Sequence, residues 1–231
     1  MAPRVGRLNS SDQSAMGRYM IIKQVQVGPD KVFCYILGCE KTHEAVIIDP
    51  GGEDERLLAI IDELQLKLRY IINTHGHPDH TAGNEKLKKA TGAEIVMHGD
   101  EQAFLHDSEA GEFFKRMGPL SPEADMLVKD GAVLPFGEYI LKVIHTPGHT
   151  PGSICLYTSG NLFTGDSLFV GAAGRVDLPG GDFQILTTSL ENKIATLPDE
   201  TVIWPGHDYG DTITSTIGRE KKENPFLGGE W

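Results

Sequence analysis

The sequence is poor in cysteine, in long apolar runs and in positive charge. It has only three cysteines among 231 residues, and so low and odd a number favours a reducing compartment, for which we expect the cytoplasm. No apolar stretch approaches the roughly 18 residues that span a bilayer, so we expect no membrane partner. Lys and Arg number 21 against 33 Asp and Glu, a net charge of −12. Because no basic run offsets this charge, we expect no nucleic-acid partner.

The start of the chain lacks structural signals as well. Residues 1–17 show no hydrophobic periodicity and no apolar segment of a secretory signal, so we interpret them as a flexible N-terminal extension. We expect residues 18–231 to form one domain, because 39% hydrophobic and 23% charged residues are typical of a globular protein.

Hydrophobic periodicity predicts strands that alternate with helices. Short apolar runs predict strands at residues 20–27, 32–37, 44–49, 68–72, 94–97, 139–145, 153–158, 161–165 and 201–205. Helical spacing predicts helices at residues 53–64, 83–91, 183–196 and 212–223. The polar stretch 99–130 predicts short helices that form a flap over a substrate. Since the order of strands, helix and strand recurs twice, we expect an α/β fold with two similar halves packed face to face and helices outside.

Histidines and aspartates follow four of these strands. Four of them come after the strand that ends at residue 72: His75, His77, Asp79 and His80. Three later strands are each followed by one more: His149, Asp166 and His207. Imidazole and carboxylate groups bind zinc, iron and manganese, and a rigid sheet holds them in place. Four such groups within six residues are too many for one tetrahedral ion, so the spacing indicates two ions side by side.

The remaining histidines lack such a pattern and are expected to be ordinary polar residues: His43, His98, His106 and His145. For His145, directly after a strand, the alternative is a hydrogen bond to a metal ligand. Asp49, next to Pro50, is interpreted as a supporting carboxylate near the metals.

The H-x-H-x-D-H box, with the later ligands in this order, resembles the metallo-β-lactamase superfamily. The resemblance covers residue 20 to about residue 227. It implies a four-layer αβ/βα sandwich of two mixed sheets, with metals in a groove at one edge. It also implies that His75, His77 and His149 hold one ion, that Asp79, His80 and His207 hold a second, and that Asp166 bridges them.

Within the superfamily, five segments resemble the short, single-domain type II glyoxalases: IDPGG at 48–52, TPGHTPG at 146–152, GRVDLPGG at 174–181, STIGRE at 215–220 and NPFL at 224–227. This branch implies hydrolysis of a small-molecule thioester, S-D-lactoylglutathione, by hydroxide shared between two metal ions, zinc with iron or manganese as alternatives. Asp79 is then a catalytic candidate that orients the hydroxide. Arg175 is a candidate to pair with a substrate carboxylate, or else with Asp177 at the surface.

A second branch also resembles the chain. Persulfide dioxygenases share the box and the Gly-Arg-x-Asp loop, and residues 205–209, PGHDY, look like that branch. Membership there implies one iron held by His75, His149 and Asp166, with open positions for oxygen and a glutathione persulfide.

Overall fold

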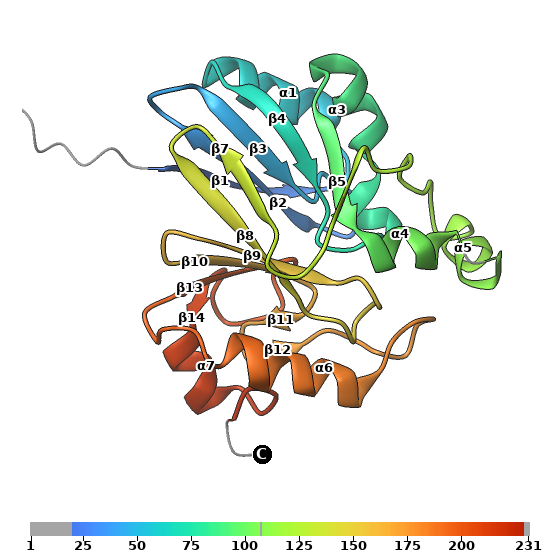
Figure 1. The fold of residues 1–231 in the computed structure, drawn as a ribbon, viewed down its shortest axis with the longest axis vertical. Coiled ribbons are helices and arrows are strands. Elements are labelled where there is room, and N and C mark those ends of the chain that lie inside the picture. Colours follow the sequence, from blue (N-terminus) through green and yellow to red (C-terminus); the bar gives the residue numbers. More distant parts are fainter. Residues whose placement is uncertain (1–19, 107, 229–231) are drawn as a thin grey trace, which may run out of the picture.

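Two six-stranded sheets pack face to face in the computed structural model, which describes residues 20–106 and 108–228 (Figure 1). The extension expected at residues 1–17 lies outside the described residues. The first sheet has the strand order β1-β2-β3-β4-β5-β6. Its strands are β1 (Met20–Val27), β2 (Val32–Cys39), β3 (Glu44–Ile48), β4 (Lys67–Ile72), β5 (Glu94–His98) and β6 (Met126–Val128). The sheet is mixed, because β1 to β3 pair antiparallel whereas β3 to β6 pair parallel.

The second sheet has the strand order β14-β13-β10-β9-β8-β7. Its strands are β7 (Val133–Phe136), β8 (Tyr139–His145), β9 (Ile154–Thr158), β10 (Asn161–Gly165), β13 (Val202–Pro205) and β14 (Ser215–Thr216). A short ribbon of β11 (Leu168–Phe169) and β12 (Ala172–Ala173) lies beyond it. Within this sheet, the parallel pair is β10 and β13. Both strands therefore end at the same edge of the sheet.

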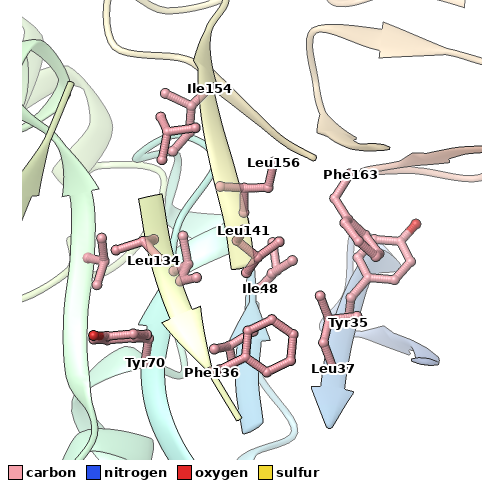
Figure 2. Close-up of a cluster of buried hydrophobic side chains, with 14 of the residues drawn as sticks. Tyr35, Leu37, Ile48, Tyr70, Leu134, Phe136, Leu141, Ile154, Leu156 and Phe163 are labelled. Atoms are coloured by element: carbon pink, nitrogen blue, oxygen red, sulfur yellow. The ribbon is translucent and has the colours of Figure 1, made fainter. Parts of the chain in front are cut away.

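A continuous apolar core fills the space between the sheets (Figure 2). Side chains of alternate strand residues meet there, because successive side chains of a strand point to opposite faces. Tyr35, Leu37 and Ile48 come from the first sheet, and Phe136 and Phe163 from the second. The Tyr35 ring meets the Phe163 ring nearly edge-on, with centroids 5.0 Å apart. This shared core holds the two sheets as one unit.

Helices cover the outer face of each sheet (Figure 1). On the first sheet, α1 (Asp54–Glu63) and α3 (Asn84–Thr91) bury Leu57, Ile61 and Leu87. On the second lie α6 (Phe183–Ser189), a π-helical turn (Leu190–Ile194) and α7 (Ile217–Glu223). The predicted four-layer sandwich of two mixed sheets is therefore confirmed. Among the described residues, none of the helices has the length and apolarity to cross a membrane.

Two predicted segments differ from the structure. Residues 99–130 contain the expected short helices, α4 (Gly99–Leu105) and α5 (Ser108–Lys115), but also β6, which was not predicted. This strand has only three residues, too few for periodicity to show. The last helix begins at Ile217, not at residue 212, because Thr216 pairs with β13 and its hydroxyl accepts a hydrogen bond from the Arg219 amide. Such an N-cap fixes the first residue of a helix.

Candidate metal centre

The loop after β4 carries the densest group of predicted ligands. His77 ends the extended segment, and Pro78 begins the one-turn helix α2 (Pro78–Thr81). Proline suits the first helical position because its missing N–H is not needed there. The turn carries Asp79 and His80, and the side-chain amide of Asn73 donates to the His80 carbonyl. The two histidines before the turn and the two ligands within it join different groups of possible metal ligands.

Three buried imidazoles converge in the first triad, His75, His77 and His149. Nε2 of His149 lies 3.3 Å from Nε2 of His75 and 3.2 Å from Nδ1 of His77. His149 comes from the second sheet, from the loop between β8 and β9. The triad therefore joins the two halves of the sandwich.

The outer nitrogens of His149 and His75 have hydrogen-bond acceptors, whereas the buried Nε2 of His77 has no hydrogen-bond partner among the described residues. Nδ1 of His149 lies 2.7 Å from the Arg175 carbonyl, which can only accept, so this nitrogen carries the proton. Nδ1 of His75 donates to the Thr74 hydroxyl, which itself donates to Asp49. Both inner Nε2 atoms therefore present lone pairs. Burial and the neighbouring histidines lower the pKa of His75 and His77 well below the ordinary value, so the rings are neutral.

Asp79, His80 and His207 form the second triad. Nε2 of His80 lies 3.3 Å from Nε2 of His207, and Oδ2 of Asp79 lies 3.6 Å from each of these nitrogens. Burial alone lowers the pKa of His80, but the carboxylates of Asp166, Asp79 and Asp49 outweigh it and raise the pKa to about 10. In the metal-free protein this ring therefore holds a proton where an ion would bind.

Asp166 lies between the triads. Its Oδ2 lies 3.8 Å from Nε2 of His149 and 3.5 Å from Nε2 of His207. Its Oδ1 is buried and has no hydrogen-bond partner among the described residues. Because β10 and β13 are parallel neighbours, with Gly165 opposite Pro205, the residues that follow them lie side by side.

This donor set fits two divalent metal ions. Each triad offers three ligand atoms within 4.8 Å of one another. Neutral imidazoles with inward lone pairs and partly unsatisfied carboxylates are the groups that bind zinc, iron and manganese. The structure brings together the seven predicted ligands, while their coordination of metal stays a prediction.

A cavity of about 390 Å³ opens over the two triads. His77, Asp79, His149, Asp166 and His207 form its floor. Its walls are largely apolar and include Met117, Pro119, Leu178 and Tyr209. Met117 and Pro119 belong to the 99–130 segment, which therefore lies beside the cavity, as the flap prediction requires. The Tyr209 ring stacks on the His207 ring at 6° between planes.

Arg175 lines this cavity but already has a partner. Its Nε and Nη2 each donate to the Asp177 carboxylate over 2.7 Å. Both side chains are largely exposed, so the pair contributes little to stability and can exchange partners. The pair uses two of the five N–H donors of the guanidinium group, so Arg175 can bind a substrate carboxylate through the others or in place of Asp177.

The structure tests two expectations about side chains near the ligands, His145 and Asp49. His145 does not hydrogen-bond to a ligand. Its Nε2 lies 2.9 Å from the Pro151 carbonyl, and its ring stacks on His98. Asp49 does support the site, through Thr74 and His80. Sequence reasoning missed Thr74 and Glu101, because single polar residues beside a ligand or in a first helical turn give no signal.

Residues 27–207 match the family model of the metallo-β-lactamase superfamily. Hydroxyacylglutathione hydrolase GloC of Haemophilus influenzae is 39% identical over 194 residues, which cover 80% of this chain and 88% of GloC. Mitochondrial persulfide dioxygenase ETHE1 of Homo sapiens is 33% identical over 227 residues, which cover 97% of this chain and 82% of ETHE1.

A solved structure agrees with these sequence matches. The crystal structure of BLEG-1, a B3 metallo-β-lactamase, has a TM-score of 0.81 at 36% identity and covers 90% of this chain and 100% of BLEG-1. The family model matches most of the chain, and the two relatives are more than 30% identical over four-fifths or more of it. The chain belongs to the metallo-β-lactamase superfamily.

Proposed function

We propose that this protein is a binuclear metal-dependent hydrolase of thioesters. The observation that carries the proposal is the position of Asp166, one oxygen of which faces a nitrogen of each triad. A carboxylate between two triads favours a pair of ions. Bound there, two divalent ions supply nucleophilic hydroxide at neutral pH and polarise a carbonyl oxygen. Zinc is the proposed metal, with iron or manganese as alternatives, because histidine and aspartate accept all three.

The remaining roles belong to side chains of the protein. His75, His77 and His149 would hold one ion, Asp79, His80 and His207 the other, and Asp166 both. The carboxylate of Asp79 is partly exposed at the cavity floor, where it can also orient the attacking hydroxide. On the cavity walls, Met117, Pro119 and Leu178 would give a bound acyl group apolar contacts.

We propose S-D-lactoylglutathione as the substrate, cleaved to D-lactate and glutathione. The similarity to GloC, named a hydroxyacylglutathione hydrolase, supports this choice. Arg175 is the cation on the cavity wall that could bind a glutathione carboxylate. Arg219 is not suited to this task, because it does not line the cavity and its guanidinium group binds Asp211 and Glu223. We further propose a cytoplasmic location, in keeping with three buried free cysteines.

A second candidate is a glutathione persulfide dioxygenase with one iron. Two observations favour it: the similarity to ETHE1, and the presence of His75, His149 and Asp166 in one cluster that offers two imidazoles and a carboxylate. Such a set leaves positions open for oxygen and substrate.

The test compares both reactions on one preparation. Purified protein is analysed for metal, then offered S-D-lactoylglutathione with a chromogenic disulfide to detect thiol, and glutathione persulfide with an oxygen electrode. Thiol release, about two ions per chain and loss of activity on chelation support the hydrolase. Oxygen uptake with about one iron per chain and no thioester cleavage would replace it by the dioxygenase. Full activity in a metal-free preparation would overturn both.

A further inference from the structure

A buried carboxylate outside the ligand set lies next to the first triad. Glu101 is in the first turn of α4, and its side chain has no exposed surface. In the part of the chain that the structure describes, it forms no ion pair with a Lys, Arg or His. Burial of a carboxylate is unfavourable unless hydrogen bonds compensate it, so its partners matter.

Three donors surround the Glu101 carboxylate. Oε1 accepts a hydrogen bond from the Gly76 amide over 2.7 Å. Oε2 accepts one from the Thr150 hydroxyl over 2.6 Å and one from the Gly152 amide over 2.9 Å. These donors come from the two loops that carry the first triad. Gly76 lies between His75 and His77, and Thr150 follows His149.

Glycines in both loops lie close against helix α4, which carries Glu101. A Cβ atom at Gly152 would lie 2.2 Å from the Glu101 amide nitrogen and 2.3 Å from its Cβ. A Cβ atom at Gly76 would lie 2.5 Å from a methyl carbon of Leu105, on the same helix as Glu101. At Gly152 only glycine permits helix α4 to approach this closely, because the nearest atoms are backbone, whereas at Gly76 the Leu105 side chain would have to move. The two glycines thus bring their backbone amides within hydrogen-bond distance of the Glu101 carboxylate.

We propose that Glu101 is the positioning residue of the first triad: its carboxylate links the two ligand loops and sets the separation of their three imidazoles, without contacting an ion itself. The loops come from different sheets. The Ile154 amide donates to the Thr74 carbonyl over 2.8 Å beside them, but this backbone contact does not reach Gly76, Thr150 or Gly152, the residues that Glu101 binds. Each oxygen binds one loop, Oε1 that of Gly76 and Oε2 that of Thr150 and Gly152. The inference rests on the metal centre of the proposed function but not on its substrate.

The second triad does not depend on Glu101. Asp79 and His80 are held by the turn of α2, with Asp49 on the His80 ring and Asn73 on its carbonyl. His207 follows β13 and is held by the second sheet. Loss of the Glu101 link should therefore change the metal affinity of one triad only, which a general loss of stability would not do.

Glu101→Gln is the sharpest variant, because it keeps the size of the side chain. The amide group has one acceptor oxygen and one NH2 group, so in either orientation the NH2 faces at least one of the three donors. His207→Ala leaves only the first triad intact, and His77→Ala leaves only the second. Zn²⁺ affinity is measured in each background by competition with a chromophoric chelator. Glu55→Gln, on the exposed first turn of α1, is the matched control.

We expect Glu101→Gln to weaken Zn²⁺ binding about 10- to 100-fold in the His207→Ala background. In the His77→Ala background we expect a change below about twofold, and the control should change neither. Unchanged affinity at the first triad would overturn the proposal. An equal loss at both triads with a lower melting temperature of the metal-free protein would also overturn it, in favour of a purely structural role.

A second variant covers the case in which Glu101→Gln fails to fold. Thr150→Val removes one of the two donors to Oε2 and leaves the carboxylate with two partners. We expect a smaller loss of Zn²⁺ affinity, confined again to the first triad. If Thr150→Val leaves the affinity of both triads unchanged, or lowers both equally, the proposal is overturned. If the unmodified protein binds no metal at all, the proposed function fails. If it binds metal and these variants bind it equally well, only the role of Glu101 fails.

Discussion

Nδ1 of His80 lies 3.1 Å from Oδ2 of Asp49, and the same oxygen accepts the hydrogen bond of the Thr74 hydroxyl. Thr74 in turn contacts Nδ1 of His75. One buried carboxylate therefore orients a ring in each triad, His80 directly and His75 through a hydroxyl. Such partners fix which ring nitrogen carries the proton and so which one faces the ion.

Asp49→Ala is expected to weaken metal binding at both triads. The loss should be about 10- to 100-fold at the second triad, where Asp49 contacts the ring directly, and smaller at the first. Metal titration in the His77→Ala and His207→Ala backgrounds separates the two values. A larger loss at the first triad would contradict this order of contacts.

His77→Ala distinguishes the two candidate functions. His77 belongs to the first triad of the hydrolase, but the iron site of the dioxygenase needs only His75, His149 and Asp166. For the hydrolase we expect metal content to fall from about two ions per chain to about one, and thioester cleavage to fall more than about 100-fold. Retained oxygen uptake on glutathione persulfide would support the dioxygenase. Full thioesterase activity would show that His77 is not a ligand.

Asp166→Ala is expected to be among the most damaging single changes. It removes the carboxylate that faces both triads, so we expect both ions to be lost. The fold should remain, because the core between the sheets does not include this side chain. Elemental analysis and circular dichroism on the same sample check the two parts. Two tightly bound ions in the variant would refute the bridging role.

Metal binding at the second triad should release a proton. The carboxylates around His80 raise its pKa to about 10, so near pH 7.5 an ion must displace the proton from this ring. The affinity of the second triad should therefore rise about tenfold per pH unit between pH 7 and 8.5. The first triad should show no such rise above pH 7, because the pKa values of His75, His77 and His149 are lowered.

Calorimetry of each single-triad background in buffers of different ionisation enthalpy measures this release. We expect about one proton per ion at the second triad and almost none at the first. Equal release from both triads would contradict the assignment of the proton to His80.

Arg175→Ala should raise KM for glutathione thioesters about tenfold while kcat and metal content change little. Asp177 already neutralises part of the guanidinium charge, so we expect the loss to be smaller than for an unpaired charged group. Arg219→Ala is the control, because Arg219 also binds carboxylates but does not line the cavity. An unchanged KM would remove Arg175 from the substrate site and leave the hydrolase standing.

The ligands could be predicted from the sequence because histidines and aspartates directly follow the apolar runs that predict strands. His75 to His80 follow a strand in a run that no turn requires, and the later ligands repeat this position. Glu101 gave no such signal, because its partners are two backbone amides and a hydroxyl that only the tertiary fold brings near. The sequence offers Asp177 as a surface partner of Arg175, and the structure adds the geometry of that pair, two hydrogen bonds of 2.7 Å.

The triads take their ligands from both halves of the sandwich, with His75, His77, Asp79 and His80 on one side and His149, Asp166 and His207 on the other. An ion bound by either triad is thus a cross-link between distant parts of the chain, comparable in its effect to a disulfide. Such a cross-link favours the docked halves over the separated ones, so occupancy and folding become one coupled equilibrium. In a cell, the supply of metal would then set how long each molecule survives proteolysis as well as how fast it turns over substrate.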